Sequence, residues 1–240
     1  MGKSTSMLII IVILTLSACC GAQEDFYQPY QEYLESGSSA GFLKAWQYYH
    51  DNGSNRTGSD LILGYLHLTE LDKIVSMLHS RVDSLDNGQK FSLANLMLGM
   101  GRYKDSIAIY EILNETIPNW SCPWRHKGEA FFRSGQLAEA ETSLLQAITT
   151  RKEHFDAYVM LAETQLELGK PAEALHTLET GLPYRGLSAE EADPEIKDSD
   201  IEFLYLELLK ANNREEEYQL KAEELKALFP EDSYWNSSKN

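Results

Sequence analysis

Hydrophobic and polar positions follow a helical period along most of the chain, and over its middle third the pattern itself repeats every 34 residues. Residues 124–148 align with residues 158–182 without a gap. The matched pairs are Trp124 and Tyr158, Gly128 and Ala162, Gly135 and Gly169, Ala140 and Ala174, Leu144 and Leu178, and Ala147 and Gly181. One interval earlier the same positions are Ala94, Gly101, Ser106, Tyr110 and Leu113. A fixed period of this length is typical of a repeat architecture.

Each repeat contains the residues that a pair of antiparallel helices needs. A glycine follows the first helical segment of each repeat, at Gly101, Gly135 and Gly169. Glycine adopts the left-handed turn at a helix end at almost no cost. Pro171 suits the first position of the helix after one such turn. Small residues allow two helices to approach closely, and the candidates are Gly128 with Ala140 and Ala162 with Ala174.

These positions resemble the tetratricopeptide repeat family, whose units carry an aromatic residue, small residues, a turn glycine and a large apolar residue in this order. The resemblance implies an all-α fold, a right-handed α-solenoid of helical hairpins. Three such units are expected at residues 87–120, 121–154 and 155–188.

The flanking segments fit the pattern less closely. A degenerate unit is predicted at residues 199–232, where Asn212 and Asn213 replace the turn glycine and Tyr218 replaces an alanine. An acidic insertion at 189–198 precedes it, and a polar tail follows at 233–240. Residues 26–86 are predicted to form further hairpins, one over 26–53 and another over 61–85, which gives five to six in all. Terminal repeats of a solenoid are expected to be atypical.

The start of the chain predicts export. Residues 7–16 form an unbroken apolar run, too short to span a membrane but suited to the core of a signal peptide at 1–18. The following "LSAC", which ends at Cys19, resembles the lipobox of bacterial lipoproteins. That resemblance implies cleavage before Cys19, a diacylglycerol on its thiol and usually an acyl chain such as palmitate on its new amino group. Residues 19–25 would then be the acylated N-terminus and a short linker.

Two other interpretations of the N-terminus stay open. A signal peptidase that cuts after Ala22 would release a soluble secreted protein. The "MGKSTS" start also fits N-myristoylation of Gly2. By resemblance to enteric lipoproteins, Cys20 is not the aspartate that retains such proteins at the inner membrane. We therefore expect an outer-membrane location that faces the periplasm.

Charge and motifs narrow the class of function. With 37 acidic and 21 basic residues the chain is unsuited to binding nucleic acid through a general field. The acidic stretch near the C-terminus is either a solvated surface or a docking patch. No phosphate-binding loop or hydrolase motif occurs, and Cys122 with His126 supplies too few ligands for zinc. We expect no enzymatic activity, no cofactor and no small-molecule substrate.

Binding surface is what remains, and the family resemblance assigns it to the first helix of each unit. The positions expected to line a concave groove are Phe91, Asn95, Leu98, Arg125, Glu129, Phe132, Val159, Glu163 and Leu166. Phe91, Phe132 and Leu166 are the predicted apolar anchors, and Asn95 and Arg125 the polar guides, although each apolar side chain could instead pack against a neighbouring hairpin. The carboxylate clamp of chaperone-binding relatives is matched only at Asn95, which disfavours such a ligand.

The sequence thus predicts a membrane-anchored adaptor of the bacterial envelope that binds a protein, either an extended peptide or a helix. Similar lipoproteins act in outer-membrane protein assembly, pilus biogenesis or cell-wall enzyme regulation. The alternatives are a regulatory helper of an envelope enzyme, such as a peptidoglycan hydrolase or protease, and a soluble secreted repeat protein.

Overall fold

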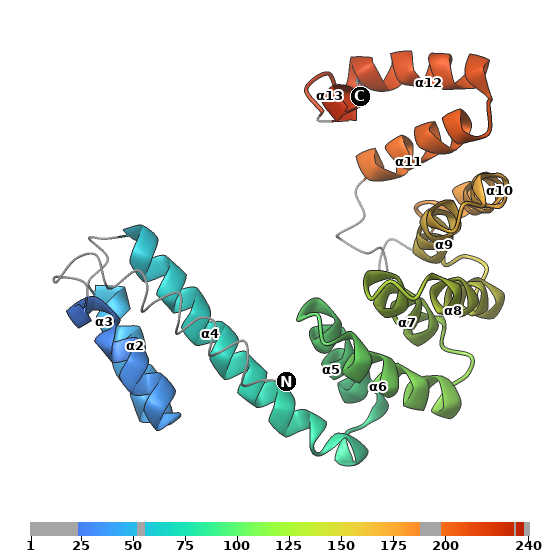
Figure 1. The fold of residues 1–240 in the computed structure, drawn as a ribbon. Coiled ribbons are helices and arrows are strands. Elements are labelled where there is room, and N and C mark those ends of the chain that lie inside the picture. Colours follow the sequence, from blue (N-terminus) through green and yellow to red (C-terminus); the bar gives the residue numbers. More distant parts are fainter. Residues whose placement is uncertain (1–23, 52–55, 188–197, 233, 238–240) are drawn as a thin grey trace. The chain divides into compact units, whose positions relative to one another are not determined.

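The computed structural model describes residues 24–51, 56–187, 198–232 and 234–237. The predicted signal peptide, Cys19 and most of the predicted acidic insertion lie outside these residues. Helices and short connections make up the described part of the chain, and no strand occurs in it (Figure 1). The predicted all-α fold of helical hairpins is therefore confirmed. None of the helices in these ranges has both the length and the hydrophobicity to span a bilayer.

The chain divides into two compact units, residues 1–80 and 81–240. The described helices of the first unit are α2 (Glu24–Ser36), α3 (Ser39–Asp51) and α4 (Arg56–His79). Half of its core is tyrosine, and the core residues are Tyr30, Tyr33, Ala45, Tyr49, Ile62 and Leu66. The Tyr33 hydroxyl donates a 2.6 Å hydrogen bond to Glu70, and the Lys73 ammonium donates to both groups. Burial of the rings and this polar contact together fasten α2 to α4.

Only one of the two hairpins predicted in this unit is present. Helices α2 and α3 form the first, and α2 begins slightly before the expected boundary at residue 26. The prediction of a second hairpin over 61–85 is wrong, because α4 is a single helix of 24 residues followed by a 3-10 turn at Val82–Ser84. Between Tyr65 and His79 the sequence has no Gly, Pro or Asn. Nothing in it favours the left-handed residue that ends a helix.

The second unit contains four hairpins in succession (Figure 1). Their helices are α5 (Asn87–Gly99) with α6 (Tyr103–Thr116), α7 (Ser121–Arg133) with α8 (Leu137–Thr150), α9 (Phe155–Glu167) with α10 (Pro171–Gly181), and α11 (Asp198–Ala211) with α12 (Glu215–Leu228). A 3-10 turn at Leu182–Tyr184 follows α10, and the short α13 (Tyr234–Ser237) follows α12.

All four hairpins use the same turn. The second residue after the first helix has positive φ in each, at Gly101 (72°), Gly135 (78°), Gly169 (74°) and Asn213 (57°). In each, the next amide donates to a carbonyl five residues earlier, and the pairs are Arg102 to Met97, Gln136 to Phe131, Lys170 to Gln165 and Arg214 to Leu209. Asparagine tolerates the left-handed conformation better than other non-glycine residues. The degenerate sequence of the last hairpin therefore preserves the turn geometry.

Gly128 lies where α7 and α8 are in close contact. A Cβ atom on this residue would lie 2.6 Å from Cγ and 2.9 Å from Cδ2 of Leu144, whose side chain is fully buried. The close approach of Leu144 thus explains why the repeat pattern has a small residue at this position.

Replacing Gly128 by alanine is expected to lower the free energy of unfolding by about 1–3 kcal/mol, the usual cost of overpacking. The better helix propensity of alanine offsets part of the clash. Gly99, at the end of α5, is the control because a Cβ there meets nothing within 4 Å. Gly99→Ala is expected to be neutral or to stabilise by up to about 1 kcal/mol. Urea denaturation measures both, and similar changes in the two variants would contradict the steric account.

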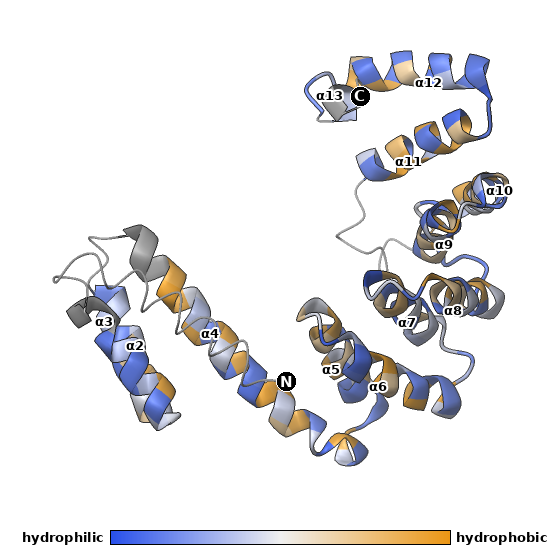
Figure 2. Cartoon of the chain, in the orientation of Figure 1, coloured by the Kyte–Doolittle hydropathy of each residue, from blue (hydrophilic) through white to orange (hydrophobic). Residues whose placement is uncertain are grey.

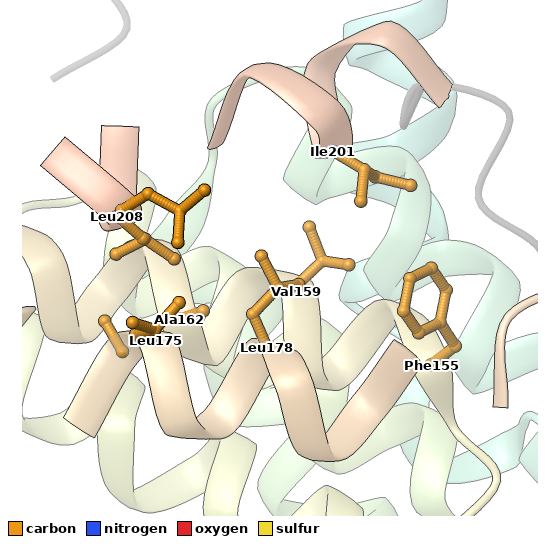
Figure 3. Packing of buried hydrophobic residues seen from close by; sticks show 9 residues of the cluster. Phe155, Val159, Ala162, Leu175, Leu178, Ile201 and Leu208 are labelled. Atoms are coloured by element: carbon orange, nitrogen blue, oxygen red, sulfur yellow. The ribbon is translucent and has the colours of Figure 1, made fainter. Parts of the chain in front are cut away.

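The largest core cluster of this unit joins the last hairpin to the one before it. It comprises Phe155, Val159 and Ala162 of α9, Ala174, Leu175 and Leu178 of α10, and Ile201, Leu208 and Leu209 of α11. Figure 3 shows Ile201 and Leu208 facing the side chains of α9 and α10. The insertion before α11 therefore leaves the stacking of the hairpins intact.

The C-terminal hairpin has the character of a cap. A second cluster forms around Phe203, Leu206, Ala222 and Leu225, with the rings of Tyr234 and Trp235 packed against it. Tyr218, which stands in place of the usual alanine, contacts both clusters instead of allowing close helix approach. Helix α12 is largely hydrophilic (Figure 2). A polar outer helix of this kind ends a solenoid without exposing its core.

Candidate functional site

A pocket of about 510 Å³ lies on the first helices of three successive hairpins, α7, α9 and α11. Its apolar lining residues are Phe132, Val159, Met160, Leu166, Phe203 and Leu204. Its charged lining residues are Glu129, Arg133, Glu163, Glu167, Asp200 and Glu207. None of the lining residues comes from α8, α10 or α12. The pocket thus occupies the face of the second unit that the first helices form.

Five of the nine predicted groove residues line this pocket: Glu129, Phe132, Val159, Glu163 and Leu166. Val159 is buried and belongs to the core cluster, and Leu166 packs against its edge. Phe132 is half-buried, and Glu163 is exposed. Phe132 and Glu163 therefore offer the most surface to a ligand, whereas Val159 mainly forms the floor.

The three predicted residues of α5 do not line the pocket. Phe91 is half-buried, and its ring lies 4.6 Å from that of Trp120 and also contacts Tyr110. Asn95 accepts a 2.7 Å hydrogen bond from the Tyr110 hydroxyl, and Leu98 is buried. The roles predicted for Phe91 as an anchor and Asn95 as a guide are therefore corrected. Both side chains join α5 to the helices that follow.

Arg125 is also misplaced by the sequence-based prediction. Only 3% of it is exposed, and its Nη1 donates a 2.6 Å hydrogen bond to Glu129 Oε2. Its guanidinium is therefore engaged inside the protein and cannot guide a ligand over the surface.

Glu129 is the centre of a buried ionic network on α7. Besides Arg125, its carboxylate pairs with Arg133 at 2.7 Å and lies 3.5 Å from His126 Nδ1. Burial alone would raise the pKa of Glu129, but the nearby His126 and the charge of Arg125 lower it to about 2. Glu129 is thus ionised and already paired within the protein.

Four further carboxylates line the pocket and are called the outer carboxylates here: Glu163, Glu167, Asp200 and Glu207. Although the Glu163 side chain is exposed, the pocket walls remove part of its water and raise its pKa, and the nearby Glu167, Glu207 and Asp200 raise it further. Arg133 is the one basic residue among the pocket's lining, and it pairs with Glu129. The unpaired charge in the pocket is therefore negative.

The residues contributed by α11 were missed by sequence reasoning, although a signal for them exists. The turn at Asn213 follows the turn at Gly169 by 44 residues, which is the 34-residue period plus an insertion of ten. The same offset carries Val159 to Phe203 and Glu163 to Glu207. Continuing the register through the insertion would have placed both residues in the groove.

Metal chemistry has no site in the described residues, where no three His, Cys, Asp or Glu side chains gather around a common point. Cys122 carries a half-buried thiol at the start of α7. The pocket offers apolar contact and carboxylate charge, which are the properties of a binding surface.

Comparison with known proteins agrees with this geometry. Residues 131–193 match the family model described as tetratricopeptide repeat. The solved structure of PilW, described as a widely conserved type IV pilus biogenesis factor, is 16% identical and superposes with a TM-score of 0.58 over 92% of this chain and 100% of that one. A tetratricopeptide repeat is therefore present at residues 131–193, and the likeness to PilW is one of fold.

Two other solved structures show more distant likeness. TTC0263, a tetratricopeptide repeat protein of Thermus thermophilus, is 13% identical, with a TM-score of 0.48 over 85% of this chain and 92% of that chain. The first repeat domain of Spaghetti (RPAP3), solved with an HSP90 peptide, is 20% identical, with a TM-score of 0.44 over 53% of this chain and 91% of that chain. No curated protein matches the chain in sequence.

Proposed function

We propose that this protein is a membrane-anchored adaptor of the bacterial cell envelope, which holds a partner protein in the pocket formed by α7, α9 and α11. The observation that carries the proposal is the pocket itself. It combines apolar side chains with free carboxylates on successive repeats, and its volume accommodates several side chains of a polypeptide.

The anchor part of the proposal rests on the sequence. The apolar run at 7–16 and the lipobox-like "LSAC" before residue 20 favour acylation of Cys19. Two or more acyl chains hold a protein stably at a membrane, whereas one chain gives only marginal binding. The pilus biogenesis role named for PilW makes envelope assembly the first context to test.

Site-specific crosslinking in living bacteria tests the proposal. A photoreactive amino acid replaces Phe132 in the pocket, and Leu145 on α8, which is 44% exposed, serves as the control position. We expect a protein adduct from position 132 that is absent from position 145. The adduct should be recovered from the membrane fraction, and a fatty-acid analogue added to the cells should label the wild-type protein but not Cys19→Ala.

Two results would overturn parts of this proposal separately. Equal adducts from positions 132 and 145 would show that the pocket is not the binding surface. A wild-type protein that takes up no fatty-acid label would contradict the acyl anchor. If the captured partner is an envelope enzyme, its rate in the presence of the purified protein distinguishes a regulatory helper from a passive adaptor.

A further inference from the structure

The carboxylates at the outer part of the pocket have no cation opposite them. Glu163, Glu167, Asp200 and Glu207 form no ion pair with any described residue. The pocket's lone basic residue, Arg133, pairs with Glu129 at 2.7 Å. Four negative charges in one concave surface repel one another, and this repulsion adds to the effect of burial in raising the pKa of Glu163. A cation that binds here would relieve the repulsion and would gain strength from the partly desolvated setting.

Apolar surface lies directly beside these charges. Phe132 of α7, Leu166 of α9 and Leu204 of α11 line the pocket and are half-buried. Apolar area removed from water contributes roughly 25 cal/mol per Å² to binding. A ligand that uses the whole pocket therefore needs both a bulky apolar group and positive charge.

Other occupants fit these features less well. The carboxylates do not converge as a metal site does among the described residues. A second copy of this chain is a poor occupant because each copy carries a net charge of −16. An acidic peptide would place like charge against Glu163 and Glu207, which costs binding energy.

We propose that the pocket of α7, α9 and α11 binds a segment of a partner protein in which lysine or arginine flanks a bulky apolar side chain. This inference rests on the proposed function and adds the chemistry of the partner. The apolar side chain lies against Phe132 and Leu166, and the basic side chains reach the carboxylates of α9 and α11. Charge of one sign in the pocket excludes segments that carry the same sign.

Synthetic peptides and the purified full-length protein in a neutral detergent provide the test. One fluorescent peptide has a central leucine flanked by lysines, a second has glutamates in place of the lysines, and a third keeps the lysines but has serine in place of the leucine. Fluorescence anisotropy measures each affinity. We expect the first peptide to bind at least about tenfold more tightly than either of the others, and to weaken as salt rises.

Charge-reversal variants locate the site. Glu163→Lys with Glu207→Lys should weaken binding of the lysine–leucine peptide at least about tenfold. Glu216→Lys with Glu223→Lys makes the same change of charge at exposed positions of α12, away from the pocket, and should leave the affinity within about twofold. Circular dichroism checks that each variant is folded. If Glu163→Lys with Glu207→Lys does not fold, Glu163→Gln with Glu207→Gln removes the same two charges with a smaller change.

The outcomes separate this inference from the proposed function. Equal binding of the acidic peptide, or equal loss in the α12 variant, would overturn the cationic specificity. A pocket crosslink to a partner without a basic apolar segment would also overturn it while leaving the adaptor role intact. Tight binding of the lysine–leucine peptide without any cellular adduct at position 132 would support the pocket chemistry and contradict the adaptor role.

Discussion

Replacing Glu129 by alanine is expected to lower the free energy of unfolding by about 3–5 kcal/mol, the usual effect of removing one partner of a buried ion pair. Glu129 and Arg125 are only 6% and 3% exposed, and their side chains meet at 2.6 Å. The substitution leaves the Arg125 guanidinium buried without this carboxylate. It also removes the carboxylate that pairs with Arg133 beside the pocket. Urea denaturation followed by circular dichroism measures the stability.

Two further variants show whether the buried charge is the cause. Glu217→Ala removes a carboxylate that is 50% exposed and pairs with Arg214 on the surface, and should leave the stability nearly unchanged because solvent screens this pair. The double variant Arg125→Met with Glu129→Leu removes both charges and should recover much of the stability lost in Glu129→Ala. A double variant that is no more stable than the single one would show that lost packing, rather than an unpaired charge, explains the effect.

Stability is also expected to fall as the solution is acidified. His154, at the start of α9, is 3% exposed, and burial followed by the charges of Arg151 and Arg125 lowers its pKa to about 3. An unfolded histidine titrates near about 6.5. Between these values the unfolded state binds more protons, so stability is lost as pH falls from about 6.5 toward 3. Because the pKa of Glu129 is lowered to about 2, protonation of this carboxylate removes stability in the same direction at lower pH.

The expected loss between pH 7 and pH 4.5 is about 2–3 kcal/mol, since each unit of pKa difference corresponds to about 1.4 kcal/mol. Urea denaturation at both pH values measures it. His154→Gln should remove most of this difference, whatever its effect on stability at pH 7. His176→Gln, at an exposed position of α10, should leave the difference unchanged. If His154→Gln keeps the full acid sensitivity, other groups cause it.

The two predictions concern neighbouring parts of one network, and that network bears on the pocket. Glu129 lines the pocket while its charge is taken up by Arg125 and Arg133. Arg133 also lines the pocket and brings one positive charge to it, against the four carboxylates of Glu163, Glu167, Asp200 and Glu207. The pocket is therefore negative because its carboxylates outnumber its single basic residue.

Sequence reasoning was strongest where a feature depends on local geometry. The turn glycines and the small residues act through backbone conformation and close helix approach, which the 34-residue period shows directly. Asn213 keeps the turn without glycine, and only the inserted residues before α11 hid the register from Val159 to Phe203. The register of first-helix positions also brought five of the nine expected residues into the pocket.

Where long-range packing decides, sequence reasoning was less successful. Phe91 and Phe132 occupy similar helical faces of neighbouring repeats, yet Phe91 packs against Trp120 while Phe132 lines the pocket. Arg125 is polar but buried, because Glu129 lies one turn away to pair with it. The helix α4 continues where a hairpin was expected, and Ile62 and Leu66 in its first half pack into the core formed with α2 and α3.

The amino-acid pattern was sufficient to establish the repeat, its turns and the all-α class, because these follow from local backbone preferences and from a periodic pattern of side-chain size. The predicted export signal and the proposed acylation of Cys19 rest on sequence alone. Which first-helix residues face solvent became clear only from the folded chain, because exposure depends on the hairpin stacked against each face. The charge of the pocket likewise required the fold, since pairing across space determines which carboxylates remain free for a ligand.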